Sequence, residues 1–297
     1  MKKKYDIFYF GNVAIDIIKT PNEEYEMTSG PILFAVGTAY QLGYTVGVLT
    51  KTAPGDRDRL KAFPVAEEDL FWRESPETVL SRMDYPTETM EQRVITNLKT
   101  AAPYEVEDFP AFSAELIHFC SLFTGEVDTS VLRRLSERAP LALDVQGLLR
   151  KVFPDGAVKY VDWEEKMEIL PLCRFFKADA AEAAFITGFD TAEHTGRVRA
   201  AEKFLDWGAK EVIISHHTEL VAADCSGVVS APLKNRGSAG RTGRGDTCFT
   251  SYMTEKFFKG PADAVKFAAA LTSLKLEVSG PFNKSRADVE AFIETFY

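Results

Sequence analysis

Short apolar segments alternate along the chain with longer stretches in which apolar residues recur at helical spacing. The short segments have the length and the β-branched or aromatic composition of buried strands. They lie at residues 5–10, 44–50, 116–120, 141–145, 175–179 and 211–215, and the alternation at residues 92–98 predicts a further strand. A helical stretch that begins at Pro31 and ends at Gly43 separates the first two, so the chain opens with a βαβ unit. The pattern predicts an α/β fold with a doubly wound, mostly parallel sheet and helices on both faces.

Further helices and two interruptions complete this pattern. Helices are expected in the stretch that holds Glu182 and ends at Gly188, at 261–278, and at 285–297. Residues 20–27 are polar and acidic, which predicts a loop or a small flap, and residues 84–91 have the composition of a loop. His118 lies inside a predicted core strand, where a structural histidine is more common than a catalytic one.

The most informative stretch is residues 238–249, SAGRTGRGDTCF. Gly240, Gly243 and Gly245 precede Asp246, and from there apolar residues recur at helical spacing. This pattern predicts a glycine loop that leads into a helix. Because the first amides of a helix have no intrahelical partner and the helix dipole is positive there, the junction suits an anion. Glycines also let the backbone approach a phosphate closely.

Asp246 has two interpretations. A carboxylate would repel a bound phosphate, but it suits a base that takes a proton from a hydroxyl attacking phosphorus. Arg241 and Arg244 would then supply compensating positive charge. The alternative is a glycine turn followed by a helix-capping aspartate, for which aspartate is a favoured residue.

Asp16 follows the first strand and its Gly11-Asn12 turn, among apolar residues. Ligands collect at the carboxyl ends of the strands of an open α/β sheet, so its carboxylate could accept hydrogen bonds from substrate hydroxyls. The alternative is a capping or exposed carboxylate at a strand end.

Composition and charge exclude some classes of partner. The 297 residues carry a formal net charge of −9, which argues against a nucleic-acid or anionic-membrane surface. Between residues 232 and 247, however, basic residues at 234, 236, 241 and 244 stand against one acid, Asp246. The local charge there is positive and favours a phosphate ligand.

Cysteine spacing and the start of the chain change the picture little. The four cysteines lie far apart without a CxxC spacing, so we expect buried thiols and neither a zinc site nor a disulfide framework. No apolar run is long enough to span a bilayer. The first residues are basic, but Asp6 interrupts the apolar run that follows, so no signal segment is indicated. We therefore expect a cytoplasmic protein.

At this point the chain resembles a known family. The loop GRTGRGDT (240–247) resembles the second signature of the ribokinase-like (PfkB) carbohydrate kinases. In the family's order along the chain, similar segments are GNVAID (11–16), SGPILFAVGTAYQLG (29–43), KADAAEAAFITG (177–188) and FAAALTSLKLEVSGP (267–281). The resemblance covers almost the whole chain. It implies one ribokinase-like α/β domain over 1–297, with a small β lid inserted from about 19–27 and 82–99.

The resemblance also implies residue roles. Asp246 would be the general base, and the amides of Gly243, Arg244 and Gly245 would form the anion hole. The substrate would contact Asp16, Gly30, Phe34 and Arg150. ATP would contact Lys177, Asp179, Ser215, His217, Thr242 and Ala269, although a solvated lysine is an equal interpretation of Lys177. Glu182 and Asp179 would help to hold Mg²⁺ through water.

Four departures from the family pattern stand out. Arg244 replaces an alanine, Asp179 replaces an asparagine, and Phe34 replaces an asparagine that binds the sugar in many members. Ser215-His216-His217 stands where Thr-x-Gly is usual. Together with DVQGLLR (144–150) and the segment 160–163, these departures most resemble a subgroup that includes myo-inositol kinases.

The function implied is an ATP-dependent kinase that transfers the γ-phosphoryl group to a hydroxyl of a sugar or cyclitol, with a myo-inositol-like substrate favoured. Two alternatives stay open: a nucleoside kinase of the same fold, and a nucleotide-binding protein without catalysis. We expect a small-molecule substrate as the partner, with no nucleic acid and no membrane. Lids of related kinases often pair between subunits, so the resemblance also allows a homodimer.

Overall fold

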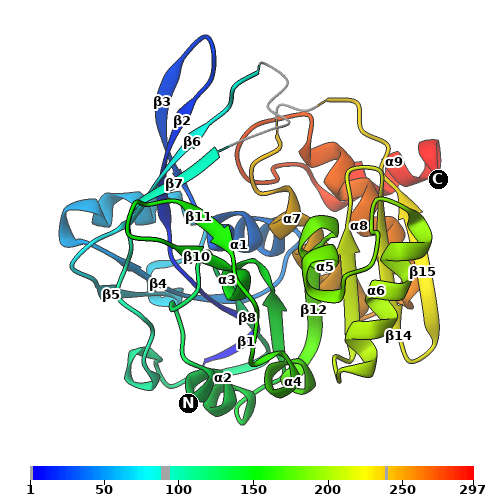
Figure 1. Cartoon of the computed structure of the whole chain (residues 1–297), viewed down its shortest axis with the longest axis horizontal. Coiled ribbons are helices and arrows are strands. Elements are labelled where there is room, and N and C mark those ends of the chain that lie inside the picture. Colours follow the sequence, from blue (N-terminus) through cyan, green and yellow to red (C-terminus); the bar gives the residue numbers. More distant parts are fainter. Residues whose placement is uncertain (1–2, 88–93, 238–239) are drawn as a thin grey trace.

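A large twisted sheet forms the centre of the molecule (Figure 1). The computed structural model describes residues 3–87, 94–237 and 240–297, and within these ranges the sheet has nine strands in the order β15-β14-β13-β12-β9-β8-β1-β4-β5. The strands are β1 (Lys4–Phe10), β4 (Val46–Thr52), β5 (Leu70–Glu74), β8 (Ser113–Phe119), β9 (Leu141–Asp144), β12 (Cys173–Asp179), β13 (Glu211–Ser215), β14 (Glu219–Asp224) and β15 (Gly227–Pro232). Their pairings are parallel except those of β14 with β13 and β15.

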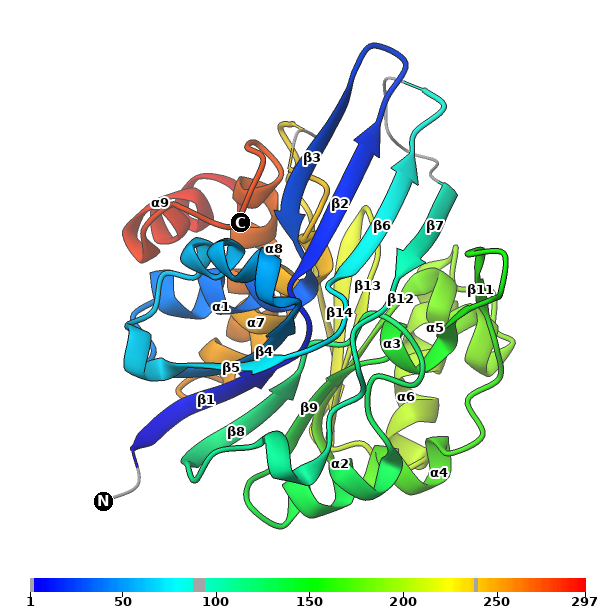
Figure 2. The ribbon, with the colours of Figure 1, turned by 90° about the vertical axis from the view of Figure 1, so that its left-hand side faces the viewer.

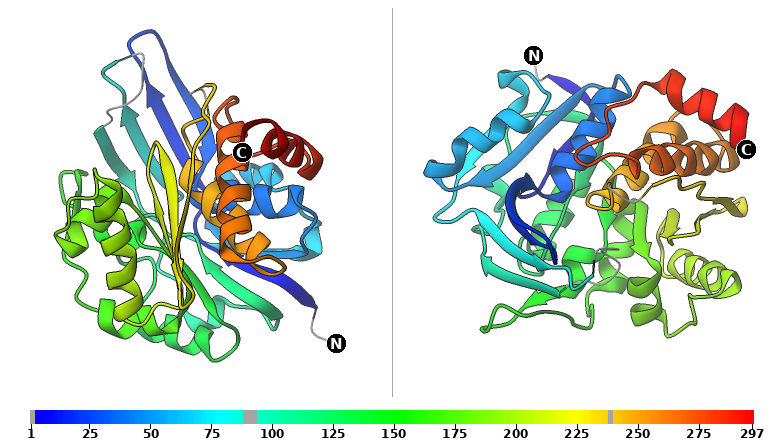
Figure 3. Two further views of the ribbon diagram at one scale, coloured as in Figure 1. Left: turned by 90° about the vertical axis from the view of Figure 1, so that its right-hand side faces the viewer. Right: turned by 90° about the horizontal axis from the view of Figure 1, so that it is seen from above.

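Helices cover both faces of this sheet (Figures 2 and 3). One face carries α1 (Pro31–Gln41), α7 (Arg244–Lys256) and α8 (Pro261–Lys275), with α9 (Arg286–Phe296) packed on α8. The other face carries α2 (Thr129–Ser136), α4 (Lys166–Ile169), α5 (Ala180–Thr187) and α6 (His194–Asp206). The short helix α3 (Gln146–Leu149) follows β9, and short 3₁₀ helices span Pro54–Ala62, Glu67–Asp69, Val106–Asp108 and Leu170–Leu172.

The two-sided cover explains the unbroken apolar strands of the sequence. In β1, Phe8 and Phe10 belong to the core shared with α2, α5 and α6, whereas Ile7 and Tyr9 belong to the core shared with α1, α7 and α8. All four side chains are fully buried. A strand covered on both faces needs apolar residues at every position, which is typical of parallel sheets between helices.

A smaller sheet stands above the carboxyl ends of the main strands (Figure 1). Among the described residues it has four strands in the order β3-β2-β6-β7, and we call it the lid. They are β2 (Ala14–Lys19), β3 (Glu24–Ser29), β6 (Val79–Asp84) and β7 (Val94–Lys99). A hairpin of β10 (Arg150–Val152) and β11 (Val158–Tyr160) lies beside the free edge of β7, where the Asn97 amide donates to the Gly156 carbonyl at 2.8 Å.

The α/β architecture, the opening βαβ unit and the helices at α1, α5, α7, α8 and α9 confirm the sequence predictions. The lid differs in extent from the expected segments, because it includes 14–18, 28–29 and 79–81 as well. Asp16 consequently lies within lid strand β2 and not at the end of a main-sheet strand. Residues 88–93, which include part of the expected loop 84–91 and the start of the expected strand 92–98, lie outside the described residues. Across the described chain, the helices are too short or too polar to cross a membrane.

Candidate active site

The glycine loop enters α7 through Gly243, which has the left-handed backbone conformation (φ 78°). A Cβ atom at this position would lie 2.1 Å from the Phe34 ring, so the loop requires glycine here for two reasons. The amide of Arg244 donates to the Arg241 carbonyl at 3.2 Å, so one of the three expected anion-hole amides is already bonded within the chain. The amides of Gly243 and Gly245 remain as the candidate donors to an anion.

Asp246 lies in the first turn of α7 and lines two adjoining cavities. Burial and the nearby carboxylate of Asp144 raise the pKa of Asp246 to about 6, against the opposing effects of Lys177, the residue's own amide and Arg150. A carboxylate tuned toward neutral pH in a cavity is a candidate general base.

The first cavity, about 270 Å³, lies between the glycine loop and the ends of β9 and β12, and we call it the transfer cavity. Two ion pairs lie at it. The Lys177 ammonium donates to Asp144 at 2.5 Å, and the Arg150 guanidinium donates to Glu182 at 3.0 Å. Burial works against the charge on Lys177, but Asp144, Glu182 and Asp179 together raise the pKa of its ammonium, so Lys177 stays charged.

The second cavity, about 70 Å³, lies beneath the lid, and we call it the acceptor cavity. It brings together all the residues to which the resemblance assigned substrate contacts. They are Asp16, Gly30, Phe34 and Arg150. Gly30 has φ 109°, and a Cβ there would lie 2.6 Å from the Asn12 carbonyl oxygen, so this position also requires glycine.

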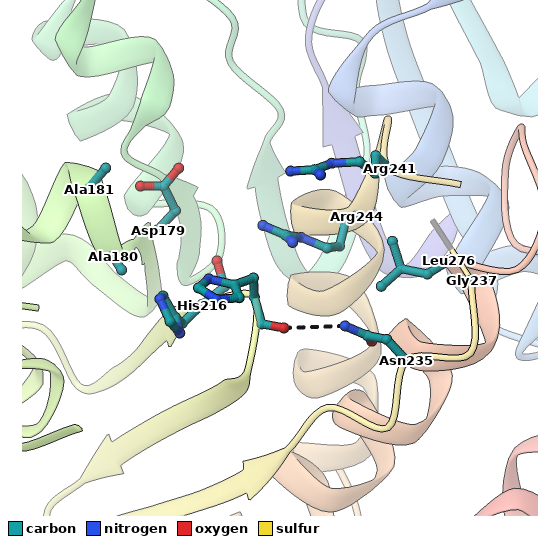
Figure 4. A pocket seen from close by; sticks show the side chains of 11 residues that line it. Asp179, Ala180, Ala181, His216, Asn235, Gly237, Arg241, Arg244 and Leu276 are labelled. Atoms are coloured by element: carbon teal, nitrogen blue, oxygen red, sulfur yellow. Dashed lines mark hydrogen bonds between the residues drawn. The ribbon is translucent and has the colours of Figure 1, made fainter. Parts of the chain in front are cut away.

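The third cavity, about 560 Å³, opens beside the end of β13, and we call it the donor cavity (Figure 4). Arg241 and Arg244 extend into it from the glycine loop and α7, toward Asp179 and His216 on the opposite wall. Ser215 and His217 line it too, and Asn235 donates to the His217 carbonyl at 3.2 Å. Burial and the neighbouring His217 lower the pKa of His216 to about 4, so His216 is neutral at pH 7.

The other residues assigned to the cofactor are dispersed. Lys177 lines the transfer cavity, Thr242 lines the acceptor cavity, and Asp179 lines both the transfer and donor cavities. Ala269 is fully buried in the core between α8 and the sheet, whereas Leu276, just after α8, lines the donor cavity.

Mg²⁺ commonly binds through one or two carboxylates plus substrate phosphates and keeps several waters. Both Glu182 oxygens are bonded, one to the Asp179 amide at 2.8 Å and one to Arg150, and the side chain is 1% exposed. Asp179 accepts from the Glu182 amide through one oxygen and borders the donor cavity. No cluster of three or more potential metal ligands occurs in the described part of the chain. Among the described carboxylates, Asp179 therefore borders the donor cavity, where it could meet Mg²⁺ carried by a donor phosphate.

Several residues that line the cavities had no expected role. Met83 and Tyr85 stand in segments without a motif, and Gln146 lies within DVQGLLR (144–150) but was given no role there. Lys275 was also missed. Its ammonium donates to the carbonyls of Gly240 and Thr242 at 2.7 and 3.0 Å, so it anchors the glycine loop from α8. Burial lowers the pKa of Lys275 to about 8.

Comparisons with known proteins agree with the observed fold. A pyrophosphate-dependent kinase of the ribokinase family, solved with a pyrophosphate analogue and myo-inositol, has a TM-score of 0.84 and 26% identity over 96% of this chain and 99% of that one. A pyrophosphate-dependent myo-inositol-1 kinase converted into a myo-inositol-3 kinase has a TM-score of 0.80 and 26% identity over 98% and 99%. Arabidopsis thaliana ribokinase with ribose and ATP shares the fold, with a TM-score of 0.76 and 16% identity over 98% and 99%.

A comparison with curated protein sequences gave no match. The family model described as pfkB family carbohydrate kinase matches residues 85–287, more than half of the chain. That segment runs from the last lid strand to α9 and includes the glycine loop, Asp246 and both ion pairs of the transfer cavity. The chain therefore belongs to the pfkB family of carbohydrate kinases and has the ribokinase-like fold of a phosphotransferase that acts on a hydroxyl group.

Proposed function

We propose that this protein transfers a phosphoryl group to a hydroxyl of a cyclitol or sugar, with Asp246 as the general base. The observation that carries this proposal is the position of Asp246, which borders both the acceptor and the transfer cavities. A hydroxyl in the acceptor cavity could meet this carboxylate on one side and a phosphoryl group on the other. Such positioning, together with electrostatic stabilisation, supplies most of the catalysis in phosphoryl transfer.

The chemical step is an in-line displacement. Asp246 takes the proton of the acceptor hydroxyl, whose oxygen forms a bond to the phosphorus of the donor. The bond from that phosphorus to the donor's bridging oxygen breaks, and the remainder of the donor leaves with the electron pair. The amides of Gly243 and Gly245 and the charges of Arg244 and Lys177 stabilise the transferring group. Mg²⁺ bound to the donor oxygens near Asp179 would neutralise further negative charge.

A myo-inositol-like acceptor is the first choice. The acceptor cavity combines the carboxylates of Asp16 and Asp246 with apolar walls from Phe34, Met83 and Leu122. Carboxylates accept hydrogen bonds from several hydroxyls, while apolar walls suit one face of a carbon ring. The myo-inositol bound to the similar pyrophosphate-dependent kinase supports this choice.

For the donor we propose pyrophosphate in preference to ATP. Arg241 and Arg244 both extend into the donor cavity, so its charge suits a compact polyanion. The similar kinases at 26% identity are described as pyrophosphate-dependent. ATP is the second candidate, because a cavity of about 560 Å³ has room for more than pyrophosphate and because the same fold binds ATP in the plant ribokinase.

One assay tests these choices together. The purified protein is incubated with Mg²⁺, either pyrophosphate or ATP, and a panel of cyclitols, pentoses, hexoses and nucleosides, and phosphorylated products are measured. We expect turnover of a cyclitol with pyrophosphate. Turnover of nucleosides alone would support the nucleoside kinase, and donor binding without any product would support a protein that has lost catalysis.

Asp246→Asn tests the base. We expect the variant to fold normally and to lose about 10²-fold to 10⁴-fold in turnover, because a positioned base contributes that much. Circular dichroism and donor binding check the fold. Near-normal turnover in the variant would reject the assignment of Asp246.

A further inference from the structure

Asp144 has no role in the proposal above, yet its carboxylate is buried at the centre of the site. It ends β9 and lies directly beside Lys177 of β12 in the parallel register of the sheet. Both side chains are about 95% buried or more, and both line the transfer cavity. One Asp144 oxygen accepts from the Lys177 ammonium at 2.5 Å, and the other accepts from the Gln146 amide at 3.2 Å.

The Lys177 ammonium lies against the glycine loop. A Cβ atom added at Gly245 would lie 3.1 Å from the Lys177 nitrogen, so the ammonium is next to the backbone that enters α7. The positive end of the α7 dipole and the Arg244 side chain are at the same place. Positive charges gathered in a buried site repel one another, and a buried ammonium is costly without a partner.

The negative charge of Asp144 offsets this repulsion and gives the buried Lys177 ammonium a partner. A carboxylate with both oxygens bonded is fixed in place, and an ammonium bonded to it at 2.5 Å is fixed as well. Asp144 and Lys177 line only the transfer cavity, whereas Asp246 lines both the transfer and the acceptor cavities.

We propose that Asp144 is a positioning residue for phosphoryl transfer, which holds the Lys177 ammonium beneath Gly245 where it contacts the phosphoryl group of the donor. This inference rests on the proposed function, because it assumes that the donor's phosphoryl group enters the transfer cavity. It predicts that Asp144 acts on the donor through Lys177 and has no direct effect on binding of the acceptor.

Asp144→Asn, Lys177→Met and the double variant test this inference. We expect Asp144→Asn to weaken binding of pyrophosphate with Mg²⁺ about 10-fold or more in calorimetry and to raise the donor KM and lower kcat, because a charge-assisted contact is lost. The acceptor KM should stay within about twofold of the wild type. The double variant should bind donor no more weakly than Lys177→Met alone, because Asp144 acts on donor binding only through Lys177. This comparison uses donor affinity and not kcat, because Asp144 also raises the pKa of Asp246. Asp144→Glu should restore part of the affinity, since it keeps the charge.

Asp108→Asn is the matched control. Asp108 pairs with the buried ammonium of Lys51 at 2.7 Å, and neither residue lines any of the three cavities. Asp108→Asn therefore breaks a buried ion pair of the fold without changing the donor-binding residues. Additive losses in the double variant, an equal rise of both KM values, or the same loss of donor affinity in Asp108→Asn would overturn the inference. Should Asp144→Asn not fold, the double variant and Asp144→Glu give the same comparison.

The donor-binding measurement separates the two proposals. If the wild type binds pyrophosphate or ATP but phosphorylates no acceptor, the proposed function fails and the role of Asp144 is still decided by donor affinity. If the wild type binds neither anion, both proposals fail.

Discussion

Asp246 illustrates how position sets the chemistry of a single residue. The first turn of α7 buries its carboxylate near the negative charge of Asp144, and both effects raise its pKa, while Lys177 and Arg150 oppose them. The resulting pKa of about 6 lies near neutral pH. At neutral pH the carboxylate is mostly deprotonated, yet it still accepts a proton readily, which is the best condition for a general base.

The pH profile of the free enzyme should report this pKa. Because only the deprotonated carboxylate accepts a proton, kcat/KM for the acceptor should fall about tenfold per pH unit below about pH 6. Rates between pH 4.5 and 8.5, with donor and acceptor both well below their KM values, measure it. A profile that stays flat down to pH 4.5 would contradict Asp246 as the base.

Sequence motifs marked many of the residues that line the cavities, but they gave no role to residues whose contacts depend on partners elsewhere in the chain. Asp246, Gly243 and Gly245 stand together in one loop. Asp144 stood in the predicted strand 141–145 and in the segment DVQGLLR but had no expected role, because its partner Lys177 is 33 residues away and meets it through the sheet register. Lys275 was hidden for the same reason, since it reaches the glycine loop from α8.

At the scale of elements, the buried strands of the main sheet were predictable from their own pattern, whereas among the lid strands only β7 was, as the expected strand at 92–98. Burial on both faces makes the covered positions of β1, β8 and β12 mostly apolar. The lid strand β3, with the sequence EYEMTS, is mostly exposed, so neither its composition nor its alternation separates it from a loop. The hairpin of β14 and β15 was missed because antiparallel strands at the sheet edge break the alternation of strands and helices.

The hairpin of β10 and β11 connects the lid to the site. Arg150 begins it and lines both the acceptor and transfer cavities, while its turn residue Gly156 accepts a hydrogen bond from Asn97 of the lid. A Cβ atom at Gly156 would lie 2.7 Å from the Asn97 carbonyl oxygen. A side chain there must push the hairpin away from the lid.

Gly156→Ala should therefore weaken acceptor binding. We expect a rise of roughly 3-fold to 10-fold in the acceptor KM with donor affinity unchanged, as displacement of about 1 Å at a binding site has effects of this order or larger. Gly280→Ala is the matched control, because Gly280 has a similar φ of 85° with no atom within 4 Å of a Cβ. Both variants should lose about 1–2 kcal/mol of stability from left-handed backbone strain. Equal KM values in the two variants would show that the contact with the lid is unimportant.

At the scale of the whole molecule, charge is distributed unevenly. The chain carries a net charge of −9, whereas Arg241, Arg244 and Lys177 gather around the donor and transfer cavities. These basic side chains would attract the anionic donor proposed above, although the net charge of the chain is negative. The cost of this arrangement is a set of buried ionisable groups whose protonation links folding to pH.

Glu126 is the clearest of these groups outside the cavities. It is 7% exposed and accepts from the Asn12 side chain at 2.9 Å and from the Leu122 amide at 2.8 Å, so it joins the loop before the lid to the wall of the acceptor cavity. Burial raises the pKa of Glu126 to about 7, against the opposing effect of these hydrogen bonds. His118 acts in the opposite sense, because burial and then Lys177 lower its pKa to about 3.

The effect of Glu126→Gln on stability should depend on pH. Below about pH 4.5, Glu126 is protonated in both the folded and the unfolded chain, so its full contribution to folding is present. Above about pH 4.5 the unfolded chain loses this proton, whereas burial keeps it on Glu126 in the folded chain until about pH 7. The contribution of Glu126 to the free energy of unfolding therefore falls as the pH rises and is lost once the pH passes about 7. The free-energy cost of Glu126→Gln, measured by urea unfolding, should therefore be on the order of 2 kcal/mol larger at pH 5 than at pH 8. The effect of His118 cancels because it is common to both proteins.

Glu137→Gln, on the exposed end of α2, is the control and should show little change. A cost for Glu126→Gln that is constant between pH 5 and 8, or that grows with pH, would mean that Glu126 is ionised in the folded protein throughout that range.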